Sequence, residues 1–376
     1  MFTIISPEQH FPILQQSLFE RANIQSNKRV IRSCGTTQVH LFKYDRAEAL
    51  QNRFTHADDA ATSTDMITLY VAQRKNCQVI DIDHQGAAHN CARVHDIGHA
   101  PFGHEGARII NERFTALGVP EGFCDNNNNL TVITKNEIEL STHTLVSVIK
   151  YPERLYPSQK VHYQALLAQE IAKDKAHFEK MDIHLENQTR TIACQIMDEA
   201  DRNSYICSDL ADFLCLGNSL SIDALKAHAK KVGLVYRFTE LTTLFAILRS
   251  GNKNAIKAHF NSLKSRFNAN YTLTSAGLTV CDKDLLAYRE FLWDIELTYY
   301  IKPLNAHREH QVKMTALNTY IDRVVNEGYA PSKHYKKAIS AAPSEVERLR
   351  LMRDMIAETT DWFILNEGRV SAADAG

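Results

Sequence analysis

The sequence predicts an all-α protein, and three observations support this fold class. Fourteen glycines and nine prolines occupy only 23 of 376 positions, about half their usual combined share, so few residues interrupt helices. Apolar residues recur at helical spacing over long stretches. Alternation typical of strands is confined to short segments such as residues 232–238. We therefore expect a helical core with additional C-terminal helices.

Three helices and one polar tract bear on function. Segment 62–74 carries apolar residues at three- and four-residue spacing, the stripe of an amphipathic helix. A second helix is predicted over 85–94, because Gly98 follows soon after it, and a third over 187–214. The tract 126–129, four consecutive asparagines, is either a loop or a turn facing a substrate, and a loop is favoured.

The C-terminal half offers fewer signals. Lys and Arg are dense from 226 to 264, which is typical of a solvated helical face and less often of a surface that contacts phosphates or single strands. Residues 271–283 are the best candidate for an irregular connection. No Gly- or Ser-rich linker divides the chain into independent domains.

Composition excludes several classes of protein. Lys and Arg number 43 and Asp and Glu 44, a net charge of -1, so no chain-wide basic field attracts nucleic acid or anionic lipid. No apolar run reaches the roughly 18 residues of a membrane span, and the N-terminal residues lack a basic region leading into an apolar core. The eight cysteines never form a CxxC pair. We expect a soluble cytoplasmic protein with reduced, mostly buried thiols and no membrane partner.

The stretch 95–104, HDIGHAPFGH, contains three histidines and one aspartate within ten residues. Packing alone rarely requires this density. Imidazole nitrogens and a carboxylate oxygen suit a divalent transition ion, and adjacent His95 and Asp96 can reach one ion where the backbone turns. His56 and Asp201 are candidates for two further ligands. The residues alone leave a mononuclear metal site and structural histidines as alternatives.

The third predicted helix carries an acidic face. Asp201, Tyr205 and Asp209 are spaced by four residues and Asp198 precedes Asp201 by three, so all four share one side of a helix. Clustered carboxylates repel each other unless a cation or hydrogen-bond donor answers them. A solvated acidic stripe is the alternative interpretation.

These residues resemble the HD-domain superfamily, and more narrowly the deoxyguanosinetriphosphate triphosphohydrolase (dGTPase) and dNTP triphosphohydrolase family. The stretch HDIGHAPFGHEG resembles that family's HDIGHPPFGHxGE, and His56, His95 with Asp96, and Asp201 follow the superfamily's order of His, His-Asp and Asp. The resemblance covers roughly residues 28 to 367. Further segments match in order: 32–39 (RIIxS and KTQV), 53–56 (RTRLTHS), 123–131 (FxxNAQSLR), 145–152 (LxxxLKYP), 198–209 (EAADDIAYSTHDLED) and 353–361 (RxDYIAGMTD).

The resemblance implies an organisation and an activity. It implies an N-terminal extension at 1–27, an HD phosphohydrolase core at 28–218, and a helical region at 219–376 that contributes to the active site and to oligomer contacts. Relatives form hexamers or tetramers, so a homo-oligomer is expected. The implied reaction is hydrolysis of a dNTP at the α-phosphorus to a deoxynucleoside and tripolyphosphate. An effector site for single-stranded DNA or a dNTP is left open.

The resemblance also implies roles for individual residues. A divalent ion, Mn²⁺, Mg²⁺ or Co²⁺, would be held by His56, His95, Asp96 and Asp201. His104 corresponds to a histidine that acts as general acid or base near the phosphorus, with His99 as a further catalytic candidate. The substrate contacts implied by position are Gln38 and Asp209 for sugar hydroxyls, Tyr205 for the deoxyribose, Arg53 and Arg202 for phosphoryl oxygens, Lys150 and Tyr151 for the phosphate side, and Asn128.

The sequence departs from the family pattern at several positions. Ala107 stands where the family has a carboxylate three residues after the active-site histidine, and Glu105 is the candidate to replace it. Asn128 stands for Gln, Thr131 stands for Arg, and an arginine-rich AFRRL stretch is absent. Guanine specificity is therefore not carried over. The alternatives are another HD phosphohydrolase, a nucleotidase or phosphodiesterase, and a catalytically decayed regulator that binds nucleotide or single-stranded DNA.

Overall fold

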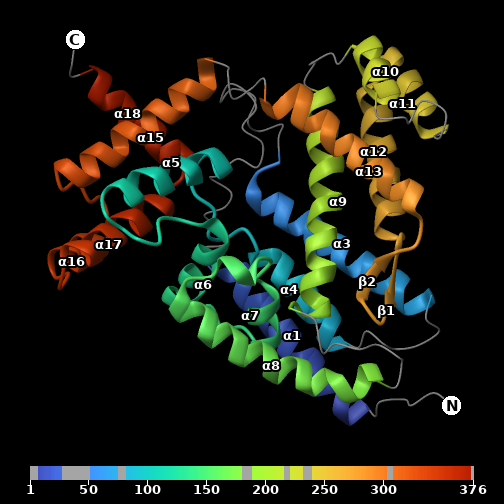
Figure 1. The fold of residues 1–376 in the computed structure, drawn as a ribbon, viewed down its shortest axis with the longest axis horizontal. Helices are drawn as coiled ribbons and strands as arrows, with labels where there is room; N and C mark the ends of the chain where they lie inside the picture. Colours follow the sequence, from blue (N-terminus) through green and yellow to red (C-terminus); the bar gives the residue numbers. More distant parts are fainter. Residues whose placement is uncertain are drawn as a thin grey trace.

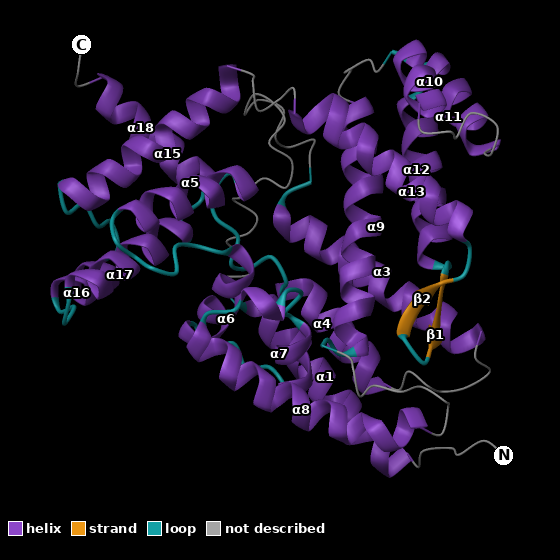
Figure 2. Ribbon diagram, in the orientation of Figure 1, coloured by secondary structure: helices purple, strands orange, loops and turns teal. Residues whose placement is uncertain are grey.

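The computed structural model describes residues 7–27, 51–74, 82–179, 189–215, 221–231, 239–302 and 308–373. Within these ranges the chain is mainly helical, and the one sheet is an antiparallel hairpin of β1 (Tyr271–Thr274) and β2 (Gly277–Val280) (Figure 2). The all-α prediction is confirmed. None of the described helices combines the length and apolarity that a membrane crossing requires.

The helices follow one another along the chain as labelled in Figure 1. Their bounds are α1 (Pro7–Ser26), α3 (Arg53–Arg74), α4 (Ile82–Val94), α5 (Gly103–Ala116), α6 (Asp125–Lys135), α7 (Thr142–Ser147), η3 (Pro152–Arg154), α8 (Pro157–Glu179), α9 (Ile192–Cys215), α10 (Ile222–Lys231), α11 (Thr239–Ser250), α12 (Lys253–Asn268), α13 (Lys283–Glu296), η4 (Leu297–Ile301), α15 (Arg308–Asn326), α16 (Lys333–Ser340), α17 (Glu345–Ala357) and α18 (Asp361–Ala373).

Helix α9 lies at the centre of the molecule, packed against α3 and α4 (Figure 1). Ile67 of α3, Ala88 of α4 and Ile196 and Ala200 of α9 are fully buried in one cluster. Small residues such as Ala200 let helix axes approach closely, which keeps polar side chains at the ends of these helices within reach of one another. This three-helix centre carries the predicted metal ligands.

The C-terminal helices pack against α5, which comes from the middle of the sequence (Figure 1). Phe114 of α5 shares a buried cluster with Tyr320 of α15, Ile356 of α17 and Ile364 of α18. The segment that follows the histidine-rich stretch is therefore fixed by residues more than 200 positions away. The predicted boundary between 218 and 219 lies outside the described residues, and the division into domains stays a prediction.

The remaining helices, α10 to α13, pack on the second half of α9. Phe260, Tyr288 and Leu292 join Leu210 in a separate buried cluster. Most lysines of the basic stretch are exposed, as expected of a solvated face, whereas Lys264 Nζ bonds Asp59 Oδ1 at 2.6 Å. Residues 232–238, for which alternation was noted, lie outside the described residues.

Two predicted helices differ from the structure in their start. The helix expected over 62–74 is the second part of α3, which begins at Arg53. Its first turns bury small and polar side chains, including Ala60, Ala61 and Thr64, which do not register as an apolar stripe. Helix α4 begins at Ile82 and α9 at Ile192, against expected starts at 85 and 187.

Two expectations about irregular segments were wrong. Residues 126–129 lie in α6, because their amide groups bond backbone of other segments and do not compete with the helix of which they form part. Residues 271–283 are mostly the β1–β2 hairpin, with Tyr271 and Leu273 pointing into the core and Leu278 N bonded to Gln195 Oε1 at 2.9 Å. The six described cysteines are all unpaired, and four are buried.

Candidate active site

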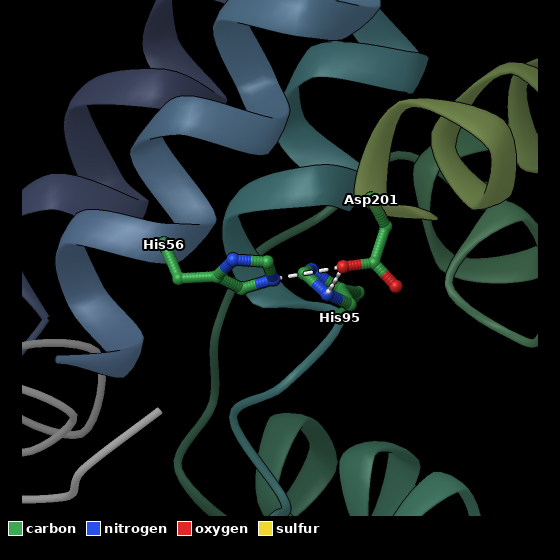
Figure 3. A group of neighbouring side chains, drawn as sticks. All are labelled: His56, His95 and Asp201. Carbon is green, nitrogen blue, oxygen red and sulfur yellow. Dashed lines mark hydrogen bonds and ion pairs between the residues drawn. The ribbon is translucent and has the colours of Figure 1, made fainter. Parts of the chain in front are cut away.

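Three side chains from three helices meet at one carboxylate oxygen. His56 Nε2 of α3 lies 2.8 Å from Asp201 Oδ1 of α9, and His95 Nε2, directly after α4, lies 3.1 Å from the same oxygen (Figure 3). Both imidazoles are fully buried, and the three ligand atoms lie within 4.8 Å of one another. The sequence assigned all three to a metal, and the packing of α3, α4 and α9 brings them together.

The protonation of His95 bears on what this cluster binds. His95 Nδ1 lies 2.6 Å from the Ala92 carbonyl oxygen, which accepts only, so Nδ1 carries a proton. In the neutral ring Nε2 is then a lone pair that faces Asp201 Oδ1, a second acceptor. A cation or a further proton must lie between them. Burial disfavours the charged imidazole, but Asp96 and Asp201 outweigh it and raise the pKa of His95.

This donor set fits a divalent ion. Two imidazole nitrogens and a carboxylate oxygen are the ligands that borderline transition ions prefer. The backbone hydrogen bond of His95 is the outer contact that commonly fixes the tautomer of a ligating histidine. The cluster of His56, His95 and Asp201 can therefore hold a metal ion.

Asp96 lies beside the cluster and is tied to a cation. Its Oδ1 is 3.3 Å from His95 Nε2 and 3.2 Å from His99 Nδ1, and its Oδ2 accepts from Arg53 Nη1 at 2.7 Å. Burial opposes ionisation, but His95, His99 and Arg53 hold the pKa of Asp96 well below its usual range. Asp96 is ionised and sits between two imidazoles, while Arg53 is committed to it.

Lys150 answers the acidic face of α9. Its ammonium group donates to Asp201 Oδ2 and lies 3.8 Å from Asp198 Oδ1, and Arg190 Nη1 donates to Asp198 Oδ2 at 2.9 Å. Burial notwithstanding, Lys150 and the histidines hold the pKa of Asp201 well below its usual value. The face is thus neutralised internally. Neighbouring Tyr151 is half-buried, with the Arg154 guanidinium 4.5 Å above its ring centre.

The asparagines of α6 hold the turn that follows α4. Asn129 Oδ1 accepts from Gly98 N at 2.7 Å, Asn129 Nδ2 donates to His95 O, and Asn128 Nδ2 donates to Gly98 O at 2.8 Å. A Cβ at Gly98 would lie 2.3 Å from Asn129 N, so this close approach requires glycine. Asn128, expected from its position to contact substrate, is buried and bonds the backbone of the turn.

The same stretch then bends into α5 through two left-handed residues. Phe102 has φ 60° and Gly103 has φ 62°, and the first of these is uncommon for a residue with a side chain. Phe102 is fully buried, and its amide donates to Asp361 Oδ1 at 2.9 Å at the start of α18. The bend places His104 in the first turn of α5 with 88% of its side chain exposed.

A second group of His and Asp side chains lies beside the first. Asp125 Oδ2, at the start of α6, is 3.6 Å from His104 Nδ1 and 3.9 Å from His99 Nε2, and the two imidazole centres are 5.3 Å apart. Burial and the charge of Arg53 lower the pKa of His99 to about 3, so this ring is neutral at neutral pH. Sequence reasoning missed Asp125. Its signal was an acidic residue at the head of the polar tract.

Glu105 lies next to His104 in sequence but pairs with another residue. Its Oε2 accepts from Arg108 Nε at 3.0 Å, and this bond lowers the pKa of Glu105. The carboxylate that the structure places beside His104 is that of Asp125. The expectation that Glu105 replaces the carboxylate missing at position 107 therefore finds no contact to support it among the described residues.

The acidic face of α9 ends in a buried carboxyl group. Asp209 is 2% exposed, and neither of its oxygens has a hydrogen-bond partner in the described part of the chain. Burial and Asp212 raise the pKa of Asp209, and Glu296 at the end of α13 is likewise buried with a raised pKa. Sequence reasoning missed Glu296. An unsatisfied buried acceptor is a suitable contact for a ligand hydroxyl.

The other predicted contacts differ in placement. Tyr205 is half-buried, and its ring centre lies 5.3 Å from that of Trp293. Arg202 is exposed, because one residue along a helix is turned by about 100° from its neighbour Asp201. Gln38 lies outside the described residues.

Comparison with known proteins gives the same direction as the geometry. A protein of Bartonella tribocorum named deoxyguanosinetriphosphate triphosphohydrolase-like protein is 23% identical over 362 residues, covering 88% of this chain and 83% of the relative. A protein of the same name from Brucella anthropi is 32% identical over 168 residues, 42% of this chain and 40% of the relative. The like-named protein 2 of Vibrio cholerae is 27% identical over 191 residues, 48% of this chain and 42% of the relative.

This chain is similar to dGTPase-like proteins. The first alignment runs through most of the chain, whereas the other two span less than half the length of the relatives. No family model matches the sequence. The names of these relatives indicate a hydrolase of the dGTPase-like type with a nucleotide substrate, and the buried histidines and aspartates are able to hold the metal ion of such an enzyme.

Proposed function

We propose that this protein is an HD-type, metal-dependent triphosphohydrolase that converts a dNTP to a deoxynucleoside and tripolyphosphate. The observation that carries the proposal is the convergence of the buried His56 and His95 imidazoles on Asp201, with Asp96 alongside. The alignment with a dGTPase-like protein over most of the chain supports the substrate class.

His56, His95, Asp96 and Asp201 would hold the ion, Mn²⁺, Mg²⁺ or Co²⁺. When bound, such an ion supplies Lewis-acid chemistry, polarising a phosphoryl oxygen and lowering the pKa of a water molecule. Arg53 and Lys150 keep Asp96 and Asp201 ionised, which preserves the negative charge that a dication requires.

The protons of the reaction are assigned to His104. Attack of water at the α-phosphorus forms one P–O bond and breaks the bond to the sugar 5′-oxygen, which leaves with a proton. His104 is exposed in the first turn of α5, where its imidazole can deliver that proton as general acid. His99, buried and neutral, faces Asp96 and offers a hydrogen-bond donor toward the phosphoryl oxygens.

The sugar and base are assigned to the face of α9 that continues from Asp201. Tyr205 offers an aromatic surface for the deoxyribose, and the unsatisfied carboxyl of Asp209 accepts from a sugar hydroxyl. Gln38, Tyr151 and Arg202 stay proposed contacts on the grounds of their sequence positions. We also propose a homo-oligomer in the cytoplasm.

The test is a product analysis. Purified protein is incubated with each of the four dNTPs and with GTP, in Mn²⁺, Mg²⁺ or Co²⁺, and nucleosides, monophosphates and polyphosphates are separated by chromatography. We expect a deoxynucleoside and tripolyphosphate, with turnover lost in Asp96→Asn and retained in His228→Gln, which alters a histidine of α10 paired with Asp294.

Other products would redirect the assignment. Orthophosphate released from a nucleoside monophosphate would indicate another HD phosphohydrolase and overturn the triphosphohydrolase reaction. Absence of turnover with mixed dNTPs and with single-stranded DNA, together with nucleotide binding, would indicate a regulator without catalysis.

A further inference from the structure

We infer that Asp125 is the positioning residue for His104, supplying from α6 the carboxylate that α5 lacks at Ala107; this inference rests on the proposed function for the role of His104. Ala107 follows His104 by three residues on α5, so a carboxylate there would share its face. Asp125 approaches the same imidazole from a different helix.

Asp125 is held so that one oxygen is available. Its Oδ1 accepts from the Ala100 amide at 3.1 Å, and its Oδ2 faces His104 at 3.6 Å and His99 at 3.9 Å. The side chain is buried, and among the described residues no Lys or Arg forms an ion pair with it. Although burial opposes ionisation, His99 and His104 lower the pKa of Asp125. Asp125 is therefore an ionised acceptor aimed at two imidazoles.

His104 needs such a partner because little else restrains it. Its side chain is 88% exposed, and an exposed imidazole samples several rotamers and both neutral tautomers. The distance of 3.6 Å to Asp125 exceeds a hydrogen bond, and contacts of this kind commonly tighten when substrate is bound. A small rotation lets Nδ1–H donate to Asp125, which leaves Nε2 facing the phosphate side of the site.

His99 is the competing partner for Asp125, and its geometry favours His104. His99 Nδ1 is already 3.2 Å from Asp96 Oδ1, and its Nε2 is farther from Asp125 than His104 Nδ1 is. His99 thus bridges the two carboxylates, whereas Asp125 is the one carboxylate that the described structure pairs with His104. Removing Asp125 should affect His104 before it affects the ligands of the ion.

The decisive variants are Asp125→Asn and the double variant Asp125→Asn/Ala107→Glu. Asparagine retains an oxygen that can accept from the Ala100 amide, so the fold is kept while the charge is removed. We expect kcat for the best dNTP to fall by about 10²-fold with KM changed less than about twofold, the mark of an interaction made in the transition state. The second carboxylate should restore kcat at least about tenfold. Glu112→Gln, an exposed residue of α5 paired with Arg108, is the matched control and leaves turnover unchanged.

A readout without turnover separates this inference from the proposed function. With ¹⁵N-labelled histidine, and His104→Gln to identify its signal, NMR reports which ring nitrogen of His104 carries the proton. We expect Nδ1–H in the wild type and a mixture of tautomers in Asp125→Asn. If no dNTP is hydrolysed, the proposed function fails and this measurement still decides the inference.

Three results would overturn the inference: an unchanged tautomer of His104 in Asp125→Asn, a raised KM at unchanged kcat, or loss of one equivalent of bound Mn²⁺. The last would mean that His99, His104 and Asp125, whose ligand atoms lie within 4.8 Å of one another, bind a second ion.

Discussion

Asn129 accepts a hydrogen bond from the Gly98 amide at 2.7 Å and donates to the carbonyl of His95, so a single side chain of α6 spans the turn that carries the candidate metal ligands. Both backbone groups are buried. Because a buried backbone group without a partner is costly, this side chain both stabilises the turn and orients His95.

Asn129→Ala leaves two buried backbone groups without partners. We expect it to lower the free energy of unfolding by about 2–4 kcal/mol and to weaken divalent-ion binding, measured by urea titration and by calorimetry with Mn²⁺. The matched control is Asn126→Ala on the same helix, for whose side chain no hydrogen bond is recorded among the described residues. Equal losses in the two variants would contradict the role of Asn129.

A divalent ion should stabilise the folded protein. Mn²⁺ at about 100 times its dissociation constant adds about 2.7 kcal/mol to the free energy of unfolding when it binds the native state alone. We expect this gain in Tm to disappear in His56→Ala and to persist in His228→Ala. A Tm shift of the same size in His56→Ala would show that the ion binds elsewhere. The measurement is a thermal melt with EDTA and with Mn²⁺.

Asp209 should make stability depend on pH. Burial and Asp212 raise the pKa of its carboxyl in the folded state, so the native protein holds this proton to a higher pH than the unfolded chain. Stability from this group is therefore present below pH ~4 and is lost as pH rises through the folded pKa. We expect Asp209→Asn to melt at a higher temperature than the wild type at pH 8 and to lose this advantage toward pH 4. A difference in Tm that is constant with pH would contradict it.

Arg289 joins α13 to α9 and to the hairpin through a buried network. Its Nη1 donates to Glu199 Oε2 at 2.6 Å, Asn203 Oδ1 at 2.8 Å and the Tyr271 hydroxyl at 2.6 Å. Replacement leaves Glu199 without its cation in a largely buried site. We expect Arg289→Leu to cost about 3–5 kcal/mol of unfolding free energy, measured by chemical denaturation.

The control for that prediction is an ion pair on the surface of the same region. Arg266 Nη2 bonds Glu240 Oε1 at 2.7 Å, and the Arg266 side chain is 48% exposed. Because solvent screens such pairs, Arg266→Gln should cost less than about 1 kcal/mol. A similar loss in both variants would mean that burial does not set the strength of these pairs.

The candidate metal ligands could be chosen from the sequence because their chemistry is written in residue type and spacing. His95 and Asp96 are adjacent, and the face of Asp201 and Tyr205 follows from helical periodicity, which is a local property. The asparagine tract was misjudged because isolated Asn favours loops, whereas in α6 Asn128 and Asn129 bond the backbone of another segment. Such bonds depend on a neighbour that local sequence does not name.

The sequence by itself determined the helical fold class, since few residues break helices and the apolar spacing is local. It also determined which side chains are chemically suited to a divalent ion. Only the tertiary structure decided that Asp125 faces His104, that Glu296 is buried together with Asp209, and that Phe102 adopts a left-handed conformation. Each of these depends on helices distant in sequence packing against one another, and the energy of that packing is not encoded in any local pattern.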